Sequence, residues 1–173
     1  MSRTRLWEVL AVAVIVGGNG AQAQTPIPPS PKDFVMTSSQ SDQYEVLAAT
    51  VASAQGQDPR VRTYAQEMIR DHTRLGEDLR QAAIASKLPP PEPGISSDQA
   101  SLLSSLQSLR GPDFDRTYAR QQTLVHAQAV AVEESFAESG SDPNLQKAAK
   151  SALPSIREHL KKAQQLSVDV GGS

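Results

Sequence analysis

Three histidines are the residues of this chain best suited to bind a metal ion. His72 lies in QEMIRDHTRLGEDL, His126 in RQQTLVHAQAVAVEE and His159 in LPSIREHLKKAQQL. Each segment has the apolar spacing of an amphipathic helix. His72 and His159 fall on the apolar stripes, where a polar ring needs a hydrogen-bond partner or a metal. His126 lies about 100° to one side of its stripe. The first question is whether the three rings converge.

The turns between the helical segments allow the heights of these residues to be compared. Residues equally far from the turn of an antiparallel hairpin lie level with each other. Glu45 and His72 are 13 and 14 positions from Asp58 in the first turn, and His126 and His159 are 16 and 17 positions from the second turn. At 1.5 Å per residue, the two planes coincide in a bundle about 44 Å long whose turns lie at opposite ends. We therefore predict one polar layer containing all four residues.

Three imidazoles and one carboxylate form a ligand set for a single transition-metal ion such as Zn, Cu, Fe or Mn. Asp71 and Glu158 each adjoin one of the histidines in the sequence, and we predict that they orient the rings by hydrogen bonds without binding the ion. The alternative is a non-catalytic structural or interaction module, in which Glu45 accepts hydrogen bonds from the histidines and sets the helix register. The chain has no Gly-rich phosphate loop and no nucleophile elbow. We do not predict an enzymatic activity or a catalytic residue.

Four long helical segments are expected to position the layer, at residues 32–54, 59–88, 112–139 and 143–166. Asp58 and Pro59 have the types expected for the N-cap and first residue of the second helix. The similar turns QGQDPRV and SGSDPNL join the helices in pairs. A long proline-containing segment with a short helix at 97–109 links the pairs and can travel the length of a bundle. The prediction is an all-α four-helix bundle of two αα-hairpins with one long crossover. Pro154 is expected to kink the last helix or open its hydrogen-bond ladder.

The N-terminal segment has the features of a secretory signal peptide. Two arginines precede a short apolar run, and Ala21-Gln22-Ala23 provides small residues for cleavage before Gln24. We expect a signal peptide at 1–23, a Pro-rich leader at 24–31, the bundle at 32–168 and a frayed tail at 169–173. The chain contains no cysteine for a disulfide or a lipid anchor. A periplasmic or secreted protein is therefore predicted.

Composition limits the classes of partner. The formal net charge is −2, which gives no basic surplus for binding nucleic acid. After removal of the signal peptide, no apolar stretch approaches the roughly 20 residues that a membrane span requires. A protein partner or a homodimer is left open by the sequence.

Four segments carry a resemblance to a known family: DFVMTSSQSDQYEVLAA, VRTYAQEMIRDHTRL, GPDFDRTYARQQTLVHAQAV and LPSIREHLKKAQQL. They resemble successive signature segments of a bacterial exported family, domain of unknown function 4142, which is grouped with ferritin-like four-helix proteins. The resemblance implies a ferritin-like bundle with no established enzyme activity. It places Glu45, His72, His126 and His159 at polar motif positions. Our own functional prediction is metal binding, with a role in metal handling or envelope stress.

The sequence departs from the ferritin pattern at two positions. A ferritin-like di-iron site uses Glu-x-x-His on two of its helices. Ile69 and Ile156 stand three residues before His72 and His159, where the bridging glutamates would be. Oxidation of iron at a two-metal centre is therefore not expected.

Overall fold

The computed structural model describes residues 29–171, which form five helices and no strand. The predicted signal peptide at 1–23 and most of the leader lie outside the described residues. The helices are α1 (Pro31–Gln55), α2 (Pro59–Ala85), α3 (Ser97–Ser108), α4 (Gly111–Ser139) and α5 (Pro143–Gly171). None of the described helices is long and apolar enough to cross a membrane.

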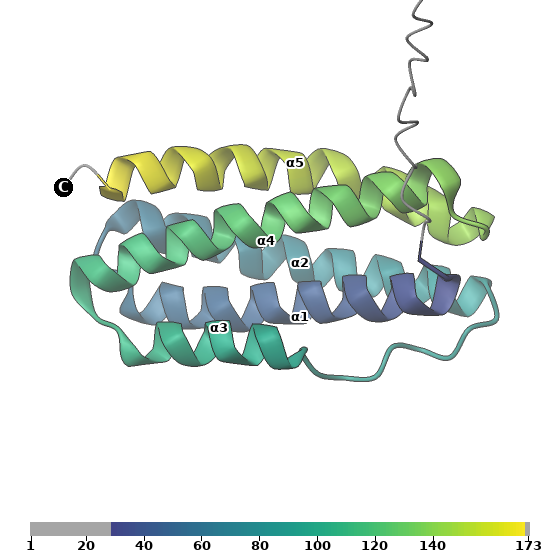
Figure 1. The fold of residues 1–173 in the computed structure, drawn as a ribbon, viewed down its shortest axis with the longest axis horizontal. Coiled ribbons are helices and arrows are strands. Elements are labelled where there is room, and N and C mark those ends of the chain that lie inside the picture. The colour runs from purple at the N-terminus through teal and green to yellow at the C-terminus, as the bar shows by residue number, and fades with distance from the viewer. Residues whose placement is uncertain (1–28, 172–173) are drawn as a thin grey trace, which may run out of the picture.

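The four long helices form a bundle of two antiparallel hairpins, α1 with α2 and α4 with α5 (Figure 1). The two hairpins also contact each other through α2 with α5 and α1 with α4. Their turns lie at opposite ends of the bundle, and the α2–α4 connection returns along its length with α3 packed against α1 and α4. This arrangement confirms the predicted all-α bundle with one crossover and a short extra helix.

The starts of α2 and α3 follow from capping residues that the sequence provides. The Asp58 side chain accepts the backbone N–H of Arg60 at 2.8 Å, and Pro59 is the first residue of α2, as predicted. Ser96 and Gln99 form a capping box at the start of α3. These caps satisfy N–H groups that have no partner inside the helix.

Two helix ends differ from the prediction. α2 stops at Ala85 rather than near Leu88, because Lys87 adopts a positive φ of 58°. The N–H groups of Lys87 and Leu88 then bond back to the last turn of the helix, in a Schellman motif. α5 continues to Gly171, so residues 169–171 of the expected frayed tail form its last turn. Burial of Val170 in the core stabilises this turn.

The apolar core has two parts with polar residues between them. The part nearest the α1–α2 turn contains Tyr44, Met68 and Tyr118 among its large side chains. The part nearest the α4–α5 turn includes Phe34 and Phe136, whose rings stack with centroids 4.0 Å apart. Burial of these side chains holds the four helices at a fixed separation and rotation.

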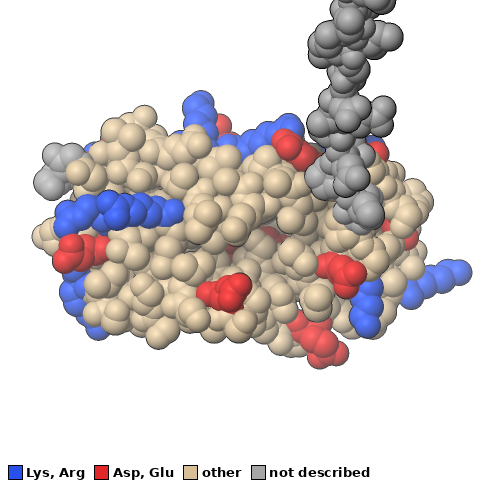
Figure 2. All heavy atoms as spheres, viewed as in Figure 1, with Lys and Arg blue, Asp and Glu red and all other residues tan. Residues whose placement is uncertain are grey.

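Side-chain hydrogen bonds also hold the two hairpins together at both ends. Asp115 of α4 accepts the backbone N–H groups of Gln57 and Asp58 in the α1–α2 turn, at 3.0 and 2.8 Å. At the other end, Ser86 donates to Asp142 in the α4–α5 turn at 2.6 Å. Basic and acidic side chains are interspersed on the face shown in Figure 2, and neither sign forms a continuous patch there.

Candidate metal centre

The three histidines meet in the polar layer between the two parts of the core. His72 comes from α2, His126 from α4 and His159 from α5, and each is at most 3% exposed. Their ring centroids are 5.3 to 5.5 Å apart. One nitrogen from each ring lies within 4.8 Å of the other two. We call this group the histidine trio.

Each ring of the trio is oriented by a hydrogen bond at one of its nitrogens. Nδ1 of His72 lies 2.8 Å from Oδ1 of Asp42, and Nε2 of His159 lies 3.1 Å from Oδ2 of Asp71. Nδ1 of His126 lies 3.0 Å from the carbonyl oxygen of Gln122. Metal-binding histidines commonly have such a carboxylate or carbonyl partner on the nitrogen that does not bind the ion.

The partners of the rings indicate which nitrogens carry hydrogen. A carbonyl oxygen only accepts, so Nδ1 of His126 is the donor and its Nε2 has a lone pair. That Nε2 lies 3.3 Å from Nε2 of His72. Nδ1 of His159 is buried without a hydrogen-bond partner among the described residues. If Asp42 and Asp71 also accept N–H groups, each ring has one nitrogen with a free lone pair, and a bound cation or an added proton would relieve the repulsion between these lone pairs.

Burial and neighbouring charges keep two of the rings neutral. Burial, with the nearby His72 and His159, lowers the pKa of His126 to about 3. Burial and the neighbouring His72 also lower the pKa of His159. Burial favours neutral His72 as well, but its hydrogen bond with Asp42 and the charge of Glu45 outweigh this effect and raise its pKa. Of the three rings, His72 is therefore the one that most readily takes up a second proton and becomes charged.

Glu45 lies in the same layer but not among the converging nitrogens. Its side chain is buried on α1, with Oε1 3.7 Å from Nδ1 of His126. That nitrogen already bonds to the carbonyl oxygen of Gln122. Burial raises the pKa of Glu45 to about 7. A role for Glu45 as a metal ligand stays a prediction.

Of the two carboxylates predicted to orient the histidines, Asp71 contacts a ring of the trio and Glu158 has no such contact among the described residues. Glu158 is 51% exposed and its closest charged partner is Lys161, at 4.0 Å. Adjacent residues of a helix point about 100° apart, so Glu158 faces outward when His159 faces the core. Sequence reasoning missed Asp42, which stands one helical turn before Glu45. The i, i+3 spacing was the signal that could have placed it on the same face.

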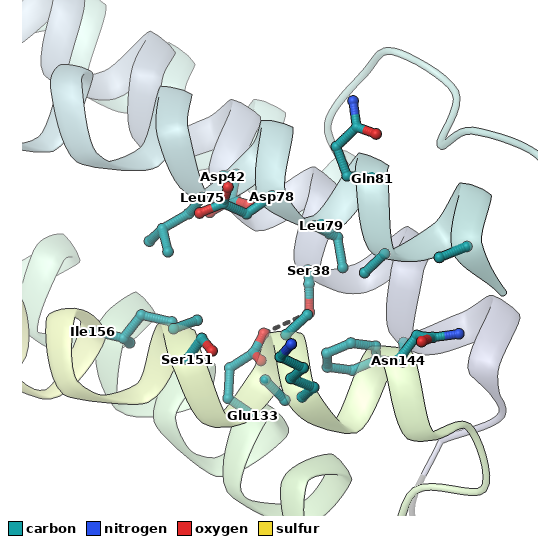
Figure 3. Close-up of a pocket in the computed structure, with 17 residues that line it drawn as sticks. Ser38, Asp42, Leu75, Asp78, Leu79, Gln81, Glu133, Asn144, Ser151 and Ile156 are labelled. Atoms are coloured by element: carbon teal, nitrogen blue, oxygen red, sulfur yellow. Dashed lines mark hydrogen bonds between the residues drawn. The ribbon is translucent and has the colours of Figure 1, made fainter.

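Two hollows of about 450 and 480 Å³ adjoin the layer on the side of the α4–α5 turn. The larger hollow reaches His72 between α1 and α4. Figure 3 shows the smaller one, where Ser38 donates to the buried Glu133 at 2.7 Å. Burial raises the pKa of Glu133 to about 7. Both hollows are lined by Ser38, Asp42, Glu133 and Ile156.

Solved structures with a similar fold come from two groups. CopM in its Cu(II)-bound form matches with a TM-score of 0.69 and 18% identity, over 82% of this chain and 98% of CopM. Its Cu(I)-bound form gives 0.67 and 20%, over 82% and 97%. A DUF305 fragment from Deinococcus radiodurans gives 0.70 and 18%, over 86% and 100%. At sequence identities this low, the structural similarity shows a shared fold and nothing more.

No curated protein sequence matches this chain. The family model described as "Domain of unknown function (DUF4142)" matches residues 17–166, which include the whole polar layer. The match confirms the resemblance noted in the four sequence segments. The chain therefore belongs to the DUF4142 family.

Proposed function

We propose that this protein binds one transition-metal ion at the histidine trio, in a metal-handling or stress role in the cell envelope. The observation that carries the proposal is the meeting of three oriented imidazoles in the core, where Nδ1 of His159 is buried and has no hydrogen-bond partner within residues 29–171. A buried lone pair with no donor costs free energy that a bound ion would recover.

The ligand set indicates which ions to test. Imidazole nitrogen suits Zn²⁺, Cu²⁺ and Fe²⁺. Two ligands at the usual Zn–N distance in a tetrahedral site are about 3.3 Å apart, and Nε2 of His72 and Nε2 of His126 are separated by 3.3 Å. Glu45 or a water molecule would supply a fourth ligand. Copper is tested beside zinc because the similarly folded CopM has been solved with Cu(I) and Cu(II).

A competing function is a structural module with a buried hydrogen-bond network. The raised pKa of His72 favours it, because a protonated His72 can donate to both Asp42 and His126. One proton then replaces the metal ion between two of the rings. This arrangement leaves Nδ1 of His159 without a partner, which is why we favour the metal.

Isothermal titration of protein without an affinity tag tests the proposal with Zn²⁺, Cu²⁺, Mn²⁺ and Fe²⁺. We expect about one tightly bound ion per chain, and loss of this tight binding in His72→Ala and in His159→Ala. Circular dichroism checks that each variant remains helical. If no ion binds wild type more tightly than the double variant His72→Ala, His159→Ala, the trio is a structural network.

The envelope location is a separate part of the proposal and rests on the sequence of residues 1–23. Mass spectrometry of protein exported by a bacterial host is expected to find Gln24 as the first residue, because Ala21 and Ala23 suit the cleavage pocket. Recovery of a chain that begins with Met1 would contradict export by cleavage.

A further inference from the structure

His159 belongs to two groups of potential metal ligands. Its Nδ1 is buried without a hydrogen-bond partner among the described residues, whereas its Nε2 lies 3.1 Å from Asp71. One ring nitrogen of His159 and one oxygen each of Glu67 and Asp71 lie within 4.8 Å of one another. We call this second group the outer cluster. The imidazole of His159 thus connects the outer cluster to the trio.

The outer cluster is more accessible than the trio. The side chains of Glu67 and Asp71 are 24% and 21% exposed, whereas the three histidines are at most 3% exposed. Glu67 and Asp71 are four residues apart on α2, so their carboxylates lie on one face of the helix. An ion approaching from this side would meet the outer cluster first.

A cationic group already occupies part of the outer cluster. Nζ of Lys162 lies 2.6 Å from Oε1 of Glu67, and the Lys162 side chain is 42% exposed. Lys162 stands three residues after His159, on the same face of α5. Its flexible, exposed side chain can move into solvent when another cation binds the carboxylate.

We propose that the outer cluster of Glu67, Asp71 and His159 captures a hydrated divalent transition-metal ion and transfers it to the histidine trio through His159. This inference rests on the proposed function of the trio. It assigns a separate role to each nitrogen of His159. Nε2 binds the ion at the outer cluster, and Nδ1 binds it at the histidine trio.

The transfer is a ligand exchange without a redox change. With the ion at the outer cluster, Nε2 of His159 binds it, and Nδ1 carries hydrogen and donates toward the lone pairs of the other two rings. With the ion at the trio, Nδ1 binds it, and Nε2 carries hydrogen and donates to Asp71. One proton therefore passes from Nδ1 to solvent and one passes from solvent to Nε2, so the charge balances.

Stopped-flow association of Zn²⁺ at low ionic strength, with a chromogenic chelator as the reporter, tests the capture step. Glu67→Gln is expected to lower the association rate about fivefold or more, and Lys162→Gln to raise it about twofold, because charge near an entry position controls the rate of ion capture. Glu77→Gln and Lys161→Gln make the same charge changes at exposed positions outside the cluster. Equal rates for Glu67→Gln and Glu77→Gln would overturn the inference and favour entry through the hollow beside His72.

An equilibrium measurement separates the outer cluster from the trio. His72→Ala disables the trio and keeps the outer ligands, so a weak Zn²⁺ site is expected to remain. Adding Glu67→Gln should abolish this residual binding, and adding Glu77→Gln should preserve it. Absence of residual binding in a folded His72→Ala variant would overturn the inference. If wild type lacks tight binding, the proposed function fails, yet a weak site lost with Glu67→Gln would still support the outer cluster.

Discussion

Nε2 of His72 and Nε2 of His126 lie 3.3 Å apart although 54 positions separate the two residues in the chain. Among the described residues, neither atom has another hydrogen-bond partner, and the second nitrogen of each ring bonds to Asp42 or to Gln122. Two neutral rings in these tautomers would place lone pairs against each other. A proton or a metal ion between the two atoms would remove this repulsion.

Asp42→Asn is expected to weaken Zn²⁺ binding about tenfold. The amide can still accept from Nδ1 of His72, but it lacks the negative charge that makes the imidazole a stronger ligand. Isothermal titration measures the change. Asp78→Asn is the matched control, because Asp78 lies in the same region, is 61% exposed and pairs with Arg74. An equal loss in both variants would show that overall charge, rather than the bond to His72, controls affinity.

Glu133→Gln is expected to change the pH dependence of stability. Burial raises the pKa of Glu133 from 4.5 to about 7, so the folded state binds more protons than the unfolded state between these values. The contribution of this group to the free energy of unfolding is fully present below about pH 4.5 and is lost as pH rises through 7. Relative to wild type, Glu133→Gln should therefore gain roughly 1–3 kcal/mol between pH 5 and 8.

Urea denaturation of chelator-treated protein at several pH values measures this gain. The amide keeps an oxygen that accepts from Ser38 and removes only the ionisable group. Glu134→Gln is the control, because Glu134 is exposed and pairs with Arg157 at the surface. A stability difference that is independent of pH would contradict the assignment to Glu133.

Asp115→Ala is expected to destabilise the fold by about 2 kcal/mol, because two backbone N–H groups of the α1–α2 turn lose their acceptor. Thermal or urea unfolding measures the loss. Asp113→Ala removes a carboxylate two residues away that is 72% exposed and pairs with Arg116. Its cost should stay below about 1 kcal/mol, as is usual for a surface ion pair. Equal losses would mean that Asp115 acts only through its charge near the start of α4.

Pro154→Ala is expected to preserve or increase stability. Pro154 is exposed and lies inside α5, where it supplies no N–H to the carbonyl of Lys150. Alanine can restore this hydrogen bond without disturbing a buried contact. Unfolding in urea checks the result. A loss above about 2 kcal/mol would show that the proline is needed for the packing of α5 beside His159.

Local sequence signals were sufficient to predict the helices and their connections. The periodic apolar residues, the Asp58-Pro59 start and the two similar turns predicted a bundle of two hairpins, which the structure confirms. The length of the crossover placed the turns at opposite ends, and counting from each turn placed the histidines at one height. These properties depend on neighbouring residues and on the fixed rise of a helix, so they can be predicted from the chain alone.

The tertiary structure decided which atoms of the polar layer meet. Helix rotation placed Asp42 rather than Glu45 against His72, and it directed Glu158 outward while Asp71 reached His159. It also gave the two nitrogens of His159 different surroundings. Rotation and side-chain rotamers are set by the simultaneous packing of all four helices, because close packing allows few combinations. Periodicity along one helix contains no information about the helix that faces it.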